Sequence, residues 1–118
     1  MADTEALTAP QLADRAADAI RDLNHTTSTL KYPGDIYSTV ANLKILAQRL
    51  PQTYQQLAGR FTQLGHDGHL RIEPGRGDLS DAQDQAYAAL YDAVVAAEAM
   101  EQALDRAHTA LGPIGYQD

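Results

Sequence analysis

Apolar residues recur every three or four positions along three stretches of this chain, which is the spacing of a helix face that packs against a neighbour. The stretches cover about residues 10–24, 36–64 and 81–111, and the loop at residues 65–80 lacks the pattern. We therefore expect an all-α protein with a single domain, residues 1–118, built from three helices. The middle stretch alternates steps of four and three without a slip, at Ile36, Val40, Leu43, Ala47, Leu50, Tyr54, Leu57, Phe61 and Leu64.

Residues that favour helix ends bracket these stretches. Thr8 suits the position before the first helix, with Pro10 in its first turn, and Asp35 suits the position before the second helix. Gly65 is typical of the residue that follows a helix, and the run Ser80–Gln83 has the form of a capping box for the third helix. These residues predict where the three helices begin and end.

The predicted architecture is a short N-terminal helix packed on a long antiparallel hairpin of the other two helices. Pro51 lies in the middle of the second helix and removes a backbone hydrogen bond there, so we expect a kink or a short break. The first helix has about 14 residues and is therefore roughly 21 Å long. It can cover only the half of the hairpin nearest Ile36, and we expect a three-helix bundle in that half.

The other half of the hairpin, roughly residues 50–64 against 82–97, has no third helix to cover it. Large apolar residues line this half nevertheless, and such a surface usually marks an association site. The expected partner is a second copy, forming a homodimer with four helices around a twofold axis, or a larger protein. The alternative is that the loop at Leu70–Leu79, or the tail with Ile114 and Tyr116, folds over this surface. The predicted partner contacts are Tyr54, Phe61, Tyr87, Tyr91, Val94 and Val95.

The charge of the chain disfavours direct binding to nucleic acid or to an anionic membrane. Sixteen acidic residues against nine Lys and Arg give a net charge of −7. Residues 25–65 hold four bases and one acid, whereas residues 78–118 hold eight acids and one base. This segregation favours pairing between the second and third helices, or else it reflects two solvated faces.

No apolar run approaches the roughly 20 residues that cross a bilayer. The first ten residues lack the basic and apolar segments of a secretory signal. We therefore expect a cytoplasmic protein.

The sequence shows no recognisable pattern of the residues that carry most enzyme chemistry. The chain has no cysteine, which excludes disulfides, thiolate catalysis and cysteine-ligated metals. Phosphate-binding glycine loops, His-Glu-x-x-His and Gly-x-Ser-x-Gly do not occur. We predict that the protein is not an enzyme, with no catalytic residues and no cofactor.

One loop has residues that could bind a metal. His66 and His69 flank an aspartate, but metal sites supply three or four ligands, so we predict no metal site. The alternative is metal or small-molecule binding by the loop from His66 to Asp78. Asp78, Asp81 and Asp84 step by three at the start of the third helix, where capping and the helix dipole explain them better than acid–base chemistry.

Two segments, Leu30–Tyr37 (LKYPGDIY) and Leu43–Gln52 (LKILAQRLPQ), resemble a group of small proteins from actinomycetes. That group consists of uncharacterised alanine-rich helical proteins, often encoded near plasmid or integrative-element genes. The resemblance covers about residues 9–65. It implies that the turn at Pro33–Asp35 and the kink at Arg49–Pro51 are structural, and it brings no activity or site residues with it.

The sequence thus supports a non-enzymatic helical module for self-association or protein–protein interaction. The resemblance implies an alternative, an accessory or regulatory protein of a mobile genetic element that acts in DNA handling through protein contacts. A metal-binding or small-molecule-binding helical domain is the remaining hypothesis.

Overall fold

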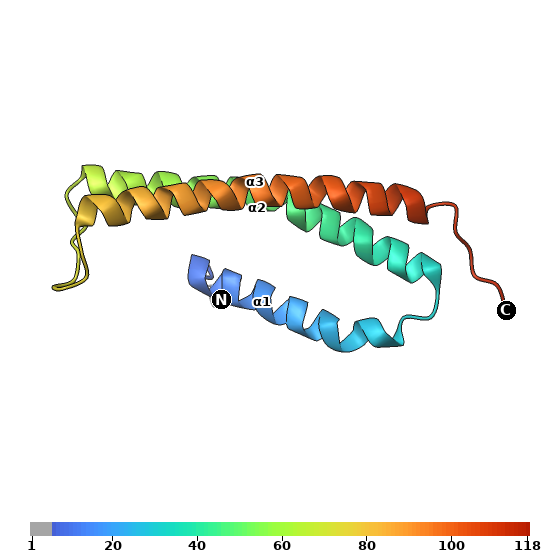
Figure 1. The fold of residues 1–118 in the computed structure, drawn as a ribbon. Coiled ribbons are helices and arrows are strands. Elements are labelled where there is room, and N and C mark those ends of the chain that lie inside the picture. The colour runs from blue at the N-terminus through green and yellow to red at the C-terminus, as the bar shows by residue number, and fades with distance from the viewer. Residues whose placement is uncertain (1–5) are drawn as a thin grey trace.

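The computed structural model describes residues 6–118, which form three α-helices (Figure 1). They are α1 (Ala9–Thr26), α2 (Pro33–His66) and α3 (Leu79–Leu111), and a 3-10 turn, η1 (Thr27–Thr29), follows α1. Helices α2 and α3 pack along each other as an antiparallel hairpin. The all-α prediction and the hairpin are confirmed, and each helix reaches at most three residues beyond its predicted ends. Residues 1–5, half of the segment in which the sequence shows no secretory signal, lie outside the described residues.

The beginning of α1 is fixed by the residues that the sequence indicated. The Thr8 hydroxyl accepts a hydrogen bond from the Gln11 backbone N–H at 3.3 Å, and the Thr8 N–H donates to Oε1 of Gln11 at 2.9 Å. This reciprocal pair is a capping box. Pro10 fits the first turn because a backbone N–H at this position would have no hydrogen-bond acceptor within the helix.

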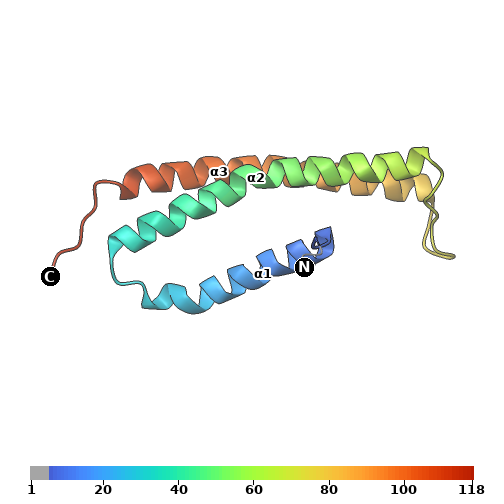
Figure 2. The same ribbon diagram turned by 180° about the vertical axis from the view of Figure 1, so that it is seen from behind.

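Helix α2 begins two residues before the predicted cap and runs on through its internal proline. Tyr32 precedes the helix without a side-chain hydrogen bond, and Pro33 occupies the first turn, so Asp35 is a first-turn acid and not the cap. The helix is continuous at Pro51, which excludes the break. The ribbon of α2 changes direction near its middle, as expected for an internal proline (Figure 2).

The end of α2 and the start of α3 differ from the prediction by a few residues. Gly65 lies inside α2, which ends at His66, and Gly68, with φ of 76°, follows the cap residue Asp67. The His69 N–H donates to Leu64 O at 2.9 Å and the Gly68 N–H to Gly65 O at 3.1 Å, which together form a Schellman motif. At α3 the cap is Asp78, whose carboxylate accepts from the Asp81 N–H at 3.1 Å, so the predicted Ser80 capping box is wrong.

The core of the hairpin is thin and made of small side chains. Its four buried residues are Ala47, Ala58, Val94 and Ala97. Because alanines occupy most of these positions, the two helix backbones approach closely along the seam. The larger apolar side chains therefore lie on the flanks of the seam and remain half-buried or exposed.

Helix α1 stands apart from the hairpin, and the predicted three-helix bundle is wrong for residues 6–118. No α-carbon of α1 lies within 8 Å of one in α2 or α3, and Figures 1 and 2 show α1 separate from the hairpin. No residue of α1 is buried. The physical reason is one of position: the three depressions described on the hairpin are lined by α2 residues from Leu50 onward, outside the half nearest Ile36 that α1 was expected to cover.

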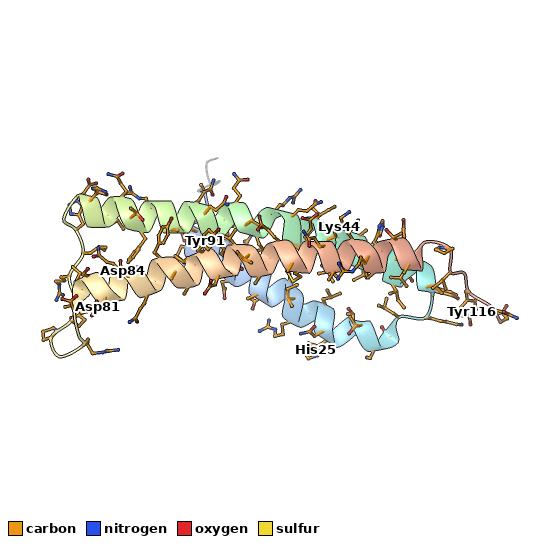
Figure 3. The ribbon with its side chains drawn as sticks, turned by 45° about the horizontal axis from the view of Figure 1, so that its top comes forward. His25, Lys44, Asp81, Asp84, Tyr91 and Tyr116 are labelled. Carbon is orange, nitrogen blue, oxygen red and sulfur yellow. The ribbon has the colours of Figure 1, made fainter. Side chains whose placement is uncertain are left out.

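The junction between α1 and α2 contacts the C-terminal tail. The Tyr32 ring meets the Tyr116 ring edge-on with centroids 5.0 Å apart, and Lys31 Nζ lies 5.4 Å and 5.8 Å from the two ring centroids. In Figure 3 Tyr116 lies beyond the end of the hairpin that is opposite the α2–α3 loop. The tail therefore stays far from the surface that it was expected, in one alternative, to cover.

The molecule is much more extended than a compact domain of its length. Its radius of gyration is 19.5 Å, and its principal extents are 64 × 41 × 24 Å. A compact chain of this length has a radius of gyration of about 13.5 Å.

Candidate docking groove

The sequence predicted partner contacts on the half of the hairpin nearer the α2–α3 loop, and most of these residues are accessible. Tyr87, Tyr91 and Val95 on α3 expose 51%, 61% and 49% of their surface. Phe61 and Tyr54 on α2 are half-buried. In Figure 3 Tyr91 lies on the same half of the hairpin as Asp81 and Asp84, which mark the start of α3. Neither the loop nor the tail covers these side chains, so the alternative of a self-covered surface is wrong.

Val94 is placed differently from the prediction. Its side chain is only 5% exposed and packs in the seam between α2 and α3. Val94 and Val95 are about 100° apart around the helix, and Val94 is the one that turns toward α2. The step from Leu90 to Val94 to Ala97 is the seam of α3, and Val95 lies on its outer flank.

Two adjoining depressions form one groove on this half of the hairpin, which we call the distal groove. Their volumes are about 510 Å³ and 440 Å³, and both are lined by Thr62 and Tyr87. From α2 the groove is lined by Gln55, Ala58, Gly59, Phe61, Thr62, Gln63, Gly65 and His66. From α3 it is lined by Gln83, Asp84, Tyr87, Leu90, Tyr91 and Val94.

The floor of the distal groove is apolar and made partly of small residues. Ala58 and Val94 are buried beneath it, and Leu90 is half-buried beside them. A Cβ atom built at Gly59 would meet nothing within 4 Å, so the groove is open at this position. At Gly65, by contrast, a Cβ would lie 2.7 Å from Nε2 of Gln83, so the Gln83 side chain from α3 reaches over α2 at the loop end.

The polar groups of the groove already have partners or face solvent. The Thr62 hydroxyl donates to the Ala58 carbonyl at 2.9 Å, and the Gln63 amide donates to the Asp67 carboxylate at 3.0 Å. Within residues 6–118, no buried side-chain nitrogen or oxygen lacks a hydrogen-bond partner. A helix that docks here would therefore contact an apolar floor without breaking a buried polar network.

Tyr54 lies on the opposite face of the hairpin, apart from Tyr87 and Tyr91. It borders a smaller depression of about 200 Å³ together with Leu50, Ala93, Ala96, Ala97 and Met100. The prediction that Tyr54 shares one surface with the α3 tyrosines is therefore wrong. Leu50, one turn before Tyr54, borders the same depression, whereas Ala58, one turn after it, lines the distal groove, and a count of apolar spacing does not distinguish these two flanks of the seam.

The charge segregation produces one ion pair between α2 and α3 among the described residues. Lys44 Nζ lies 2.7 Å from Oδ1 of Asp105 (Figure 3 labels Lys44). The hydrogen bond from Lys44, together with its positive charge, lowers the pKa of the Asp105 carboxyl. The same hydrogen bond raises the pKa of the Lys44 ammonium. Gln48 on α2 also donates to Glu101 on α3 at 3.1 Å, so polar contacts join the half of the hairpin remote from the loop.

The residues with metal-binding chemistry do not converge. Within the part of the chain that the structure describes, no group of three or more His, Asp or Glu side chains could hold a metal ion. His66 lines the distal groove, whereas His69 is exposed in the loop. At the other end of the hairpin, His108 stacks on Tyr37 with ring centroids 4.1 Å apart.

On the α2 side of the distal groove, sequence reasoning identified only Phe61 and missed the other lining residues. Gln55, Gly59, Thr62 and His66 step by four, three and four residues along the flank of the seam. This row has helix spacing but is polar, so a search for apolar residues passes over it. Ala58-Gly59, a pair of small residues in a helix, is the signal in the sequence that could have located it.

The chain matches no protein-family model, and comparisons with curated proteins and with solved structures give no match. The resemblance drawn from the two segments between Leu30 and Gln52 therefore stays an expectation. None of the helices in residues 6–118 combines the length and the apolar character that crossing a membrane requires.

Proposed function

We propose that this protein is a non-enzymatic helical association module whose distal groove docks a helical protein partner. The partner in the first instance is a second copy of the chain. The distal groove offers a long apolar floor flanked by two accessible tyrosine rings, and this arrangement is typical of helix-in-groove recognition.

The observation that carries the proposal is the excess surface of the single chain. The accessible surface area is 9029 Å², whereas a compact protein of 12.8 kDa exposes about 6,300 Å². The excess, about 2,700 Å², is more than the roughly 800 Å² that each partner buries in a standard interface. Association with another chain is the ordinary way for a thin helical hairpin to bury such an excess.

The side chains around the distal groove supply suitable interface energy. Burying a large apolar side chain contributes about 1.5–3 kcal/mol, and tyrosine buries its ring while keeping its hydroxyl hydrated or paired. Tyr87, Tyr91 and Val95 are all about half exposed or more in the single chain, so each gains from a partner. Tyrosine is also among the residues that dominate measured interface energies.

The proposal is tested by placing a charge at the groove and measuring self-association. Tyr91→Arg removes an aromatic ring and adds a guanidinium beside an apolar floor. We expect it to raise the dimer dissociation constant at least about tenfold, since losing such an anchor costs about 2 kcal/mol or more. Light scattering over a dilution series measures this constant.

Gln85→Arg is the matched control, because it adds the same charge to an exposed position of α3 outside the groove. We expect this variant to associate as the unmodified chain does. Equal dissociation of both variants, or of neither, contradicts docking at the distal groove.

A further inference from the structure

The distal groove has a candidate occupant within the chain itself. Helix α1 has an apolar stripe on one side, which we call the α1 stripe, and no α-carbon of the hairpin lies within 8 Å of that helix. Leu12 is 53% exposed and Ile20 is 37% exposed, although both are large apolar residues. The α1 stripe consists of Leu12, Ala16, Ala19, Ile20 and Leu23. We propose that α1 of one copy docks in the distal groove of a second copy, and reciprocally, an inference that rests on the proposed function.

The α1 helix cannot reach the distal groove of its own hairpin. The groove begins at Gln55, about 33 Å along α2 from Pro33, at 1.5 Å per residue. Folded back along α2, the 18 residues of α1 span about 27 Å and end short of the groove. The turn that joins them is closed by the hydrogen bond from the Leu30 N–H to Thr27 O at 3.2 Å, so the connection adds little reach. The occupant must therefore come from another molecule.

The α1 stripe and the groove have matching lengths. The stripe runs from Leu12 to Leu23, and the groove runs over Gln55–His66 on α2 and Gln83–Val94 on α3. Each of these three segments is 11 helical steps long, or about 17 Å. One α1 helix therefore fills the groove from end to end.

The two surfaces also match in shape and charge. Small residues lie at the centre of both, Ala16 and Ala19 on the stripe and Ala58 and Gly59 in the groove, so the helices can approach closely. Larger side chains are at the margins, with Leu12 and Leu23 at the ends of the stripe. The stripe carries no charged residue, and the one acid of the groove lining, Asp84, is exposed at the start of α3, where its carboxylate can keep its contact with solvent.

An antiparallel twofold arrangement brings both pairs of surfaces together. With the two hairpins side by side and reversed, the distal half of each lies beside the start of α2 in the other copy. Helix α1 of the other copy is attached at that start of α2. In Figure 1, α1 runs back alongside the half of its own hairpin that contains the start of α2. Both grooves are then filled by equivalent contacts, as a closed dimer requires.

Cysteine cross-linking tests this directly, because the natural chain has no cysteine. One chain carries Ala16→Cys on the stripe, and a second chain, with a tag that changes its mass, carries Gly59→Cys in the groove. Gly59 has open space for a side chain. After mixing and treatment with a short bismaleimide, we expect a covalent heterodimer as the main product, identified by mass spectrometry.

Two pairings serve as controls. Asp14→Cys lies on the side of α1 away from the stripe, and Arg60→Cys lies outside the groove lining. Pairing Asp14→Cys with Gly59→Cys, or Ala16→Cys with Arg60→Cys, should give only background cross-linking. A control yield equal to that of the test pair contradicts the proposal.

The remaining outcomes separate this proposal from the proposed function. If the chain is a dimer but the test pair does not cross-link, the groove of the dimer holds something other than α1, and only this inference fails. If the double variant Ala16→Cys, Gly59→Cys closes within single chains, α1 covers its own groove and this inference fails as well. If the protein is a monomer throughout, both fail together.

Discussion

Single residues determine which parts of the hairpin are held together and which are open. Lys44 and Asp105 join α2 to α3 at 2.7 Å in the half remote from the loop. Ala58 and Val94 form the seam in the other half, where no ion pair between the helices is found among residues 6–118. The half near the loop therefore depends on small apolar contacts and is the half whose flank remains available to a partner.

The Lys44–Asp105 pair gives a prediction about pH. The lowered pKa of Asp105 means that its contribution to stability is present above the unfolded value, about 3.9, and is lost as the pH falls through the folded value. The raised pKa of Lys44 means that its contribution is present below about 10.4 and is lost as the pH rises through the folded value. The pair therefore acts across the whole neutral range.

A titration of the side-chain carboxyl signals by NMR measures this effect. We expect Asp105 to titrate below the usual range of aspartate and to return toward it in Lys44→Met. Arg49→Met is the control. This substitution also removes one positive charge from α2, but Arg49 forms no ion pair with Asp105. An unchanged Asp105 titration in Lys44→Met contradicts the pairing.

At the scale of elements, apolar spacing predicted the existence of all three helices and the hairpin. Some of the residues that carry the spacing, such as Ala47 and Ala97, are buried in the seam between α2 and α3, although Leu57 of the same α2 series is 47% exposed. The position of α1 could not be predicted. Apolar spacing shows that a helix has an apolar side, but it does not identify the surface against which that side packs. The separation of Tyr54 from Tyr91 was also hidden, since both have seam-like spacing yet lean to opposite faces.

Helix ends were harder to predict than helix cores, and α3 offers a direct test. Asp78 and Ser80 are both residue types that cap helices, and only the Asp78 side chain makes the capping hydrogen bond. We expect Asp78→Ala to lower the free energy of unfolding by about 0.5–2 kcal/mol. The matched change Ser80→Ala should alter it by less than about 0.5 kcal/mol. Urea denaturation of the two variants at one protein concentration compares them, and a larger loss in Ser80→Ala would show that the helix begins elsewhere.

At the scale of the whole molecule, the single chain is extended and buries little, which is the ground for the association that we propose. Its radius of gyration of 19.5 Å and its four small buried residues describe a helical hairpin with an arm, without the core of an independent domain. The excess surface and the exposed side of α1 are two aspects of this same shortage of buried area. In the dimer that we propose, a second copy would supply an α1 for the groove and a groove for the α1.

Sedimentation equilibrium of the unmodified chain at micromolar concentration is the most direct measurement of this account. We predict a mass of twice 12.8 kDa, with the dimer persisting on dilution through the micromolar range. A mass of 12.8 kDa at every concentration would mean that the single chain is stable with its groove and its α1 stripe exposed, and it would contradict the account.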